Sequence, residues 1–143
     1  MSNKMKLRVL TNTGKGKLLA LAKAMADEYS NYAADKIDPA YPCDNERLVV
    51  IFVTAAPKYS DVFRRFCCSL NKNLAQNVAL VVDGDMEKAQ PVVDWLREAG
   101  AKFCDEIYTI NGGLPFKFMS KYTAEEKDGL FAWLGRVVDS FKA

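Results

Sequence analysis

The chain has 143 residues, half of them hydrophobic and 27% charged, and its formal net charge is +2. This length suits a single domain over residues 1–143 with a real core, and the composition excludes a disordered protein. The charge is too mild and too scattered for a nucleic-acid-binding surface, which usually carries a concentrated basic patch. The one local basic cluster, Arg64-Arg65, lies within an apolar helical pattern, so we interpret it as a solvated helix face.

The sequence also predicts the compartment. Its start, "MSNKMKLRVL", lacks the long apolar stretch of a signal peptide, and no window approaches the ~20 apolar residues that cross a bilayer. The four cysteines form no C-x-x-C pair and histidine is absent, which argues against zinc or non-haem iron. We therefore expect a reduced, cytoplasmic protein without a structural metal or a membrane span. Cys67 and Cys68 are adjacent in a helical pattern, where one of them is expected to pack in the core, and a redox role of either stays open.

The first third of the chain predicts a strand, a helix and two further extended segments. Residues 7–10, "LRVL", form a short strand in which Arg8 must lie near the strand end or extend toward solvent. A weaker extended piece at 35–38 precedes the turn-rich "PAYPCDNE", and "RLVVIFVTA" at 47–55 suits a strand buried on both faces. The helix between them has one apolar face, made of Leu18, Leu21, Ala22, Met25 and Tyr29.

The rest of the chain repeats this alternation. Strands are predicted at 77–82, "NVALVV", and at 102–110, "KFCDEIYTI", and a turn at "NGGLPF". Gly100 is expected to end one helix, and Thr123 with Glu126 forms a T-x-x-E capping box that begins the last one. The apolar faces of the three helices are Phe63, Phe66, Cys67, Leu70 and Leu74; Ala89, Val92, Val93 and Leu96; and Leu130, Leu134, Val137, Val138 and Phe141.

Strands that alternate with single helices predict an α/β fold with a parallel sheet covered on both faces. About five strands suit a three-layer, doubly wound, five-stranded sheet of order 2-1-3-4-5. In such sheets ligands bind beyond the carboxyl ends of the strands, at the switch between the first and third strands. The loops to consider therefore begin at Thr11, Thr54 and Asp83.

The first of these loops, "TNTGKGK" at 11–17, has the features of an anion site. Backbone N–H groups at the start of a helix, together with the helix dipole, attract a phosphate. Hydroxyl groups of Thr11 and Thr13 could donate to it, Gly14 and Gly16 would allow close approach, and the lysines add positive charge. The alternative is a tight turn followed by a helix whose first residues happen to be basic.

Several other phosphate motifs do not fit this loop. A Walker A loop would need a hydroxyl residue where Leu18 stands, and the G-x-G-x-x-G fingerprint fails after Gly16. A phospho-acceptor receiver would need acidic residues where the chain has Thr11-Asn12 and Thr54-Ala55. No cysteine lies in a phosphate loop, there is no G-x-S-x-G elbow, and the lack of histidine excludes the usual hydrolytic triads.

The remaining pattern resembles that of the flavodoxin family. Thr11-Asn12-Thr13-Gly14-Lys15 matches the first five positions of the family's [ST]-x-T-G-x-T loop, and Gly16 stands where a hydroxyl residue is usual. The segment "RLVVIFVTAAPKYSD" is similar to the family's third strand and its loop. "VFRRFCCSL", "NVALVVDGD", "LREAGAKF" and the final helix follow in the same order, so the resemblance spans nearly the whole chain.

The resemblance implies FMN as the cofactor and electron transfer to a redox protein partner, either as a carrier or as a component of a flavin-dependent reductase. The phosphate would lie against Thr11–Gly16. The flavin ring would lie between Asp83-Gly84-Asp85 and the loop formed by Ala55, Ala56, Pro57, Lys58 and Tyr59. In this interpretation Tyr59 stacks on the ring; otherwise it is a half-exposed aromatic after a proline turn.

A second interpretation keeps the fold without the flavin. Members of the family that carry electrons are typically acidic, whereas Lys15, Lys17 and Lys58 make the neighbourhood of this site basic. That charge predicts acidic partners. It also suits a binding or interaction module that has lost FMN and recognises a protein or another phosphorylated ligand.

Overall fold

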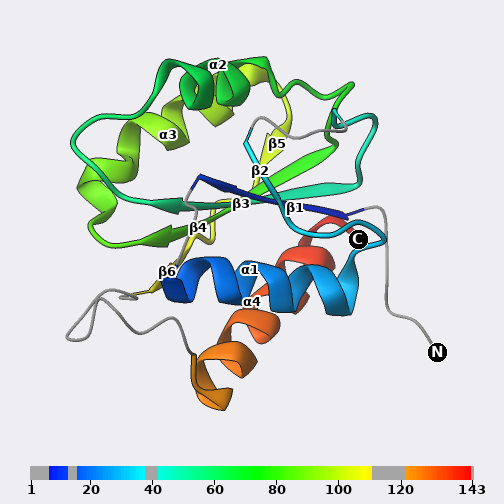
Figure 1. Cartoon of the computed structure of the whole chain (residues 1–143). Helices are drawn as coiled ribbons and strands as arrows, with labels where there is room; N and C mark the ends of the chain where they lie inside the picture. Colours follow the sequence, from blue (N-terminus) through cyan, green and yellow to red (C-terminus); the bar gives the residue numbers. More distant parts are fainter. Residues whose placement is uncertain (1–6, 13–15, 38–41, 111–121, 143) are drawn as a thin grey trace.

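A parallel sheet lies in the middle of the molecule, with α2 and α3 over one face and α1 and α4 over the other (Figure 1). The computed structural model describes residues 7–12, 16–37, 42–110 and 122–142. The elements are β1 (Leu7–Asn12), α1 (Gly16–Tyr29), β2 (Asp35–Lys36), β3 (Leu48–Thr54), α2 (Asp61–Ser69), β4 (Asn77–Asp83), α3 (Met86–Ala99), β5 (Lys102–Phe103), β6 (Tyr108–Ile110) and α4 (Ala124–Lys142).

The strand order confirms the predicted α/β topology. The sheet runs β2-β1-β3-β4-β5, every pair is parallel, and β6 also pairs with β4. The central strands pair over their full length: β1 and β3 align from Leu7↔Leu48 to Asn12↔Val53. The chain therefore leaves β1 toward β2 on one side and returns to β3 on the other.

The fifth strand differs from the prediction of one continuous strand over 102–110. Phe103 pairs with Val78, and Tyr108 pairs with Val81. These two partners are five residues apart in the outer strand but only three apart in β4, so the outer strand contains two additional residues that bulge out. We call Cys104–Ile107 the edge bulge. Extra residues of this kind leave part of the ladder unpaired.

Side chains of α4 hold the edge bulge in place. The indole N–H of Trp133 donates to the Glu106 carbonyl at 2.7 Å, and the Arg136 guanidinium binds the Glu106 carboxylate through Nε at 2.9 Å and Nη2 at 2.6 Å. The hydrogen bond from Arg136 lowers the pKa of Glu106. The bulge therefore exchanges ladder hydrogen bonds for bonds to the neighbouring helix.

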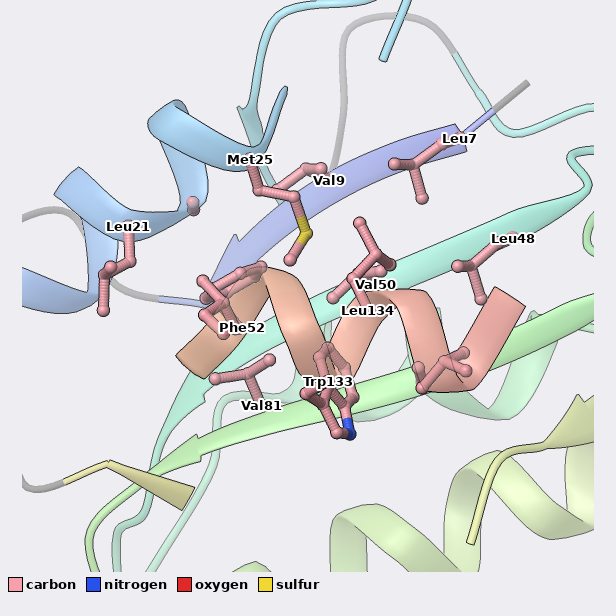
Figure 2. Close-up of a cluster of buried hydrophobic side chains, with 14 of the residues drawn as sticks. Leu7, Val9, Leu21, Met25, Leu48, Val50, Phe52, Val81, Trp133 and Leu134 are labelled. Atoms are coloured by element: carbon pink, nitrogen blue, oxygen red, sulfur yellow. The ribbon is translucent and has the colours of Figure 1, made fainter. Parts of the chain in front are cut away.

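The sheet divides the core into two layers. Val50 and Phe52 of β3 face α1 and α4, where they meet Met25 and Trp133 (Figure 2). The alternate β3 residues, Val49, Ile51 and Val53, face α2 and α3. Both faces of β3 are buried, which explains its continuous apolar run. Trp133 is fully buried and was not among the predicted core residues of the last helix.

The helices keep most of their predicted faces and boundaries. Gly100 ends α3 in the left-handed conformation at φ 112°. The capping box begins α4: Thr123 N–H donates to the Glu126 carboxylate at 2.8 Å, and Glu126 N–H donates to the Thr123 hydroxyl at 3.1 Å. However, α2 ends at Ser69, so Leu74 packs from the turn that follows it. The predicted "NGGLPF" turn lies outside the described residues.

The predictions for the two adjacent cysteines and the two adjacent arginines of α2 are confirmed, whereas Phe66, predicted on the apolar face, is only half-buried. Cys67 is fully buried, Cys68 is exposed, and burial raises the pKa of the Cys67 thiol. Arg64 and Arg65 are exposed, as expected for a solvated helix face. Within the described ranges, no helix combines the length and the apolar character that crossing a bilayer requires.

An ion pair is buried at the start of β1. Arg8 lies near the strand end, as predicted, but it is only 3% exposed. Its Nη1 lies 3.6 Å from Oε2 of Glu46, and its guanidinium lies 4.9 Å from the centre of the Tyr32 ring. Because desolvation of two charges offsets their attraction, such a pair fixes geometry more than it adds stability.

Candidate functional site

The carboxyl ends of β1, β3 and β4 meet at one edge of the sheet, which we call the carboxyl edge. Asn12 pairs with Val53, and Thr54 pairs with Asp83, so the three loops that follow these strands begin side by side. The described members of the predicted site lie at these strand ends or in the segments that follow them; they are Thr11, Asn12, Gly16, Ala55, Ala56, Pro57, Lys58, Tyr59, Asp83, Gly84 and Asp85. Thr13, Gly14 and Lys15 lie outside the described residues.

The loop after β1 leads directly into α1. Thr11 is buried, and its carbonyl accepts a hydrogen bond from Ile37 N–H at 3.0 Å, while Asn12 is half-buried. Gly16 begins α1 with φ +84°, and among the described residues no atom lies within 4 Å of the position its Cβ would take. A β-branched residue is strained at such a φ, which gives a backbone reason for glycine where the flavodoxin pattern has a hydroxyl residue.

The positive charge of Lys17 is used within the protein. Its Nζ lies 2.6 Å from Oε2 of Glu126 at the start of α4. Burial acts to raise the pKa of the Glu126 carboxyl, but hydrogen bonds from Lys17 and Thr123 outweigh it, and the net pKa is lowered. Lys17 therefore adds less positive charge to the anion site than the sequence alone indicated.

The loop after β3 is fixed by the side chain of Tyr59. Its hydroxyl donates to the Lys88 carbonyl at 2.7 Å and accepts from Ala56 N–H at 3.2 Å. The Tyr59 ring packs against Phe63, with ring centres 5.6 Å apart, and edge-on against Trp95 at 6.0 Å. This placement matches the alternative given above for Tyr59, in which it is a half-exposed aromatic residue after a proline turn. Stacking of Tyr59 on a ligand stays a prediction.

The loop after β4 lies against the loop after β3. Ala55 N–H donates to the Asp83 carbonyl at 2.9 Å, and Gly84 N–H donates to the Ile110 carbonyl at 3.0 Å. Gly84 has φ +114°, and a Cβ there would lie 3.4 Å from Cβ of Ala55. Asp85 caps α3, because its carboxylate accepts from Glu87 N–H at 2.9 Å. At this end of the site the two loops present small side chains and backbone.

Two partners that shape the site were not predicted from the sequence. Trp95 confines the Tyr59 ring, and Glu126 pairs with a lysine 109 residues earlier in the chain. The capping-box motif did identify Glu126 as the residue at the start of the last helix, but nothing in the local pattern indicates its ion pair. Over the residues that the structure describes, no group of three or more cysteine or acidic side chains could hold a metal ion.

Comparisons with known proteins give no relative from which a function could be inferred. No protein-family model, no curated protein and no solved structure matches this chain.

Proposed function

We propose that the chain is a flavodoxin-like protein that binds FMN at the carboxyl edge and transfers electrons to a redox protein partner. The observation that carries this proposal is the start of α1 between β1 and β3, where the strand order reverses. Ligands of doubly wound sheets bind at this switch point, and a helix that begins there offers its N–H groups and its positive dipole end to a phosphate.

The residues at the first loop fit a single phosphate group. Gly16 has no side chain at the helix start, so an anion can approach its backbone closely. The hydroxyl group of Thr13, together with Gly14 and Lys15, completes the predicted phosphate loop. With Lys17 paired to Glu126, backbone N–H groups supply more of the attraction than lysine charge does.

The other two loops fit the flavin ring through small residues. Ala55 and Ala56 are half-buried and Gly84 has no side chain, so a flat ring can pass close to the backbone. When bound, FMN supplies the redox chemistry, since it can carry one or two electrons. The protein's residues hold and orient the ring and shield it from water, and Asp83 and Asp85 place negative charge beside it.

The direct test is an absorbance spectrum of the purified full-length chain, followed by titration with FMN. We expect bands in the blue and near-ultraviolet, or quenching of FMN fluorescence on titration. Asn12→Asp places a negative charge at the phosphate end and should weaken FMN binding about tenfold, which corresponds to ~1.4 kcal/mol. Asn31→Asp makes the same change at an exposed position beyond the far end of α1 and should leave binding unchanged.

A colourless protein that does not quench FMN fluorescence would contradict the proposal. The second candidate, a binding module of the same fold without flavin, would then be favoured. It draws support from Tyr59, whose ring and hydroxyl are engaged within the protein, and from the neutralised charge of Lys17. The cytoplasmic location stays a prediction under either function.

A further inference from the structure

Helix α2 carries a second stripe of side chains on its outer side. Val62, Arg65, Phe66 and Ser69 recur with the spacing of one helix face and line a hollow of about 330 Å³. We call these four residues the α2 face. It is distinct from the inner face of α2, where Phe63 and Cys67 are fully buried.

The apolar part of the α2 face, Val62 and Phe66, is only partly explained by packing against the core. A helix that covers a sheet with one side normally presents polar residues to solvent on the other. Val62 is 55% exposed, because it points away from the core face that Phe63 occupies. Phe66 packs only partly against the core, so the rest of its ring forms a wall of the hollow.

The charge on this helix is positive. Arg64 lies 3.6 Å from Asp61 one turn earlier, so these two charges are paired. Arg65, on the α2 face itself, makes no ion pair or hydrogen bond with any residue that the structure describes. The apolar hollow is therefore flanked by a guanidinium that is available to a carboxylate.

We propose that the α2 face is a docking surface for another protein that presents an apolar side chain flanked by carboxylates. The apolar side chain would enter the hollow between Val62 and Phe66, and a carboxylate would bind Arg65. Charge complementarity selects this occupant, because acidic residues would be attracted to the unpaired guanidinium and basic ones repelled. The proposal does not depend on FMN and goes beyond the proposed electron transfer.

The experiment uses the isotope-labelled full-length chain and three helical peptides of equal length. Each peptide carries the same leucine residues, flanked by Glu, Gln or Lys. We expect the Glu peptide to shift the amide NMR signals of the α2 face and to bind about tenfold more tightly than the Gln peptide. Its affinity should fall as salt is raised from low to physiological concentration, since exposed charges are screened.

Two variants and a matched control test the site. Arg65→Glu should weaken binding of the Glu peptide about tenfold, and Val62→Ser should weaken binding of both the Glu and the Gln peptides. Lys23→Glu makes the same charge change at an exposed position on α1 and should have no effect. Circular dichroism of each variant confirms that the fold is kept.

Several outcomes would overturn the proposal. The Lys peptide could bind as tightly as the Glu peptide, or the Glu peptide could fail to bind. The NMR shifts could be spread over all basic residues of the protein, or Lys23→Glu could weaken binding as much as Arg65→Glu does. Concentration-dependent shifts of the α2 face without peptide would point to a second copy of this chain instead. Stronger binding to phosphatidylserine vesicles than to the Glu peptide would point to a lipid surface.

Discussion

Gly129 and Gly135 lie on the same helix, α4, and differ in their surroundings. A Cβ at Gly129 would lie 2.7 Å from the Tyr108 hydroxyl, whereas a Cβ at Gly135 would have no atom of the described residues within 4 Å. Tyr108 has limited room to move, because its ring packs against Trp133 with ring centres 5.8 Å apart. The absence of a side chain at Gly129 therefore lets β6 and α4 approach each other.

Replacing each of these two glycines by alanine should change the free energy of unfolding in opposite directions. Gly135→Ala should raise the free energy of unfolding by about 1 kcal/mol, because alanine is the better helix former. Gly129→Ala should lower it by about 1 kcal/mol, since overpacking outweighs the same helix gain. Urea denaturation measures both changes. The double variant Tyr108→Phe/Gly129→Ala should recover stability, and equal stabilisation by the two single alanine variants would show that Tyr108 moves aside without cost.

Arg8 shows how far a single residue can be predicted. A charged side chain in an apolar strand pattern had to lie near the strand end, and it does. Its burial could not be predicted, because it depends on Glu46 and on the Tyr32 ring, which the fold brings to it from other segments. Local sequence therefore fixes the position of a residue in a strand better than the partners of its side chain.

At the scale of elements, Lys17 and Glu126 join the start of α1 to the start of α4. The same Glu126 carboxylate accepts from Lys17 at 2.6 Å and from the Thr123 N–H at 2.8 Å. One side chain thus caps a helix and pairs with the helix beside the candidate phosphate site.

This arrangement predicts a pH-dependent contribution to stability. The folded-state pKa of Glu126 is lowered from its ordinary value of 4.5. Its contribution is therefore fully present above pH 4.5 and is lost as the pH falls through the lowered pKa. Glu126→Gln keeps a capping side chain without the charge, so it should melt at a lower temperature at pH 7. The difference in melting temperature between this variant and the unmodified protein should become smaller in acid, as measured by circular dichroism.

A matched control for Glu126 is Glu125→Gln, which removes one charge from the same turn and leaves the Lys17–Glu126 pair intact. It should change the melting temperature much less at pH 7. The melting temperatures of the unmodified protein and of Glu126→Gln could instead differ by a constant amount down to strongly acidic pH. That result would contradict the role given to the Glu126 carboxylate.

Elements with a regular apolar pattern could be predicted, and the exceptions depend on contacts between elements. The helices are confirmed because burial of one face repeats along the chain, as in α3 with Val92, Val93 and Leu96. The interruption of the fifth strand could not be predicted, because Trp133 and Arg136 hold Glu106 from a distant helix.

In the candidate site, too, some features follow from the pattern of the sequence and others depend on contacts between elements. Parallel strands end at one edge, so the meeting of the loops that begin at Thr11, Thr54 and Asp83 follows from the topology. The direction of the Tyr59 ring does not follow from the topology, because it is set by Trp95 on α3 and by the Lys88 carbonyl.

At the scale of the whole molecule, stability should decrease from the centre of the sheet to its edges. Ile51 of β3 and Val81 of β4 are fully buried and paired on both sides, whereas β2 and β5 have two residues each. We expect amides of β3 and β4 to exchange with deuterium only on global unfolding. Amides of β2 and β5 should exchange on the order of a hundredfold faster through local opening. Uniform exchange rates across the sheet, measured by NMR, would contradict this expectation.

The edge bulge has a further consequence for how the protein behaves at high concentration. An unbroken edge strand is a template on which a strand of another molecule can add, and this is a common first step of aggregation. Here the outer edge changes register between Phe103 and Tyr108, and α4 ties down the segment between them. The opposite edge, β2, is only two residues long. Both borders of the sheet are therefore poor templates, which favours a protein that stays dispersed when crowded.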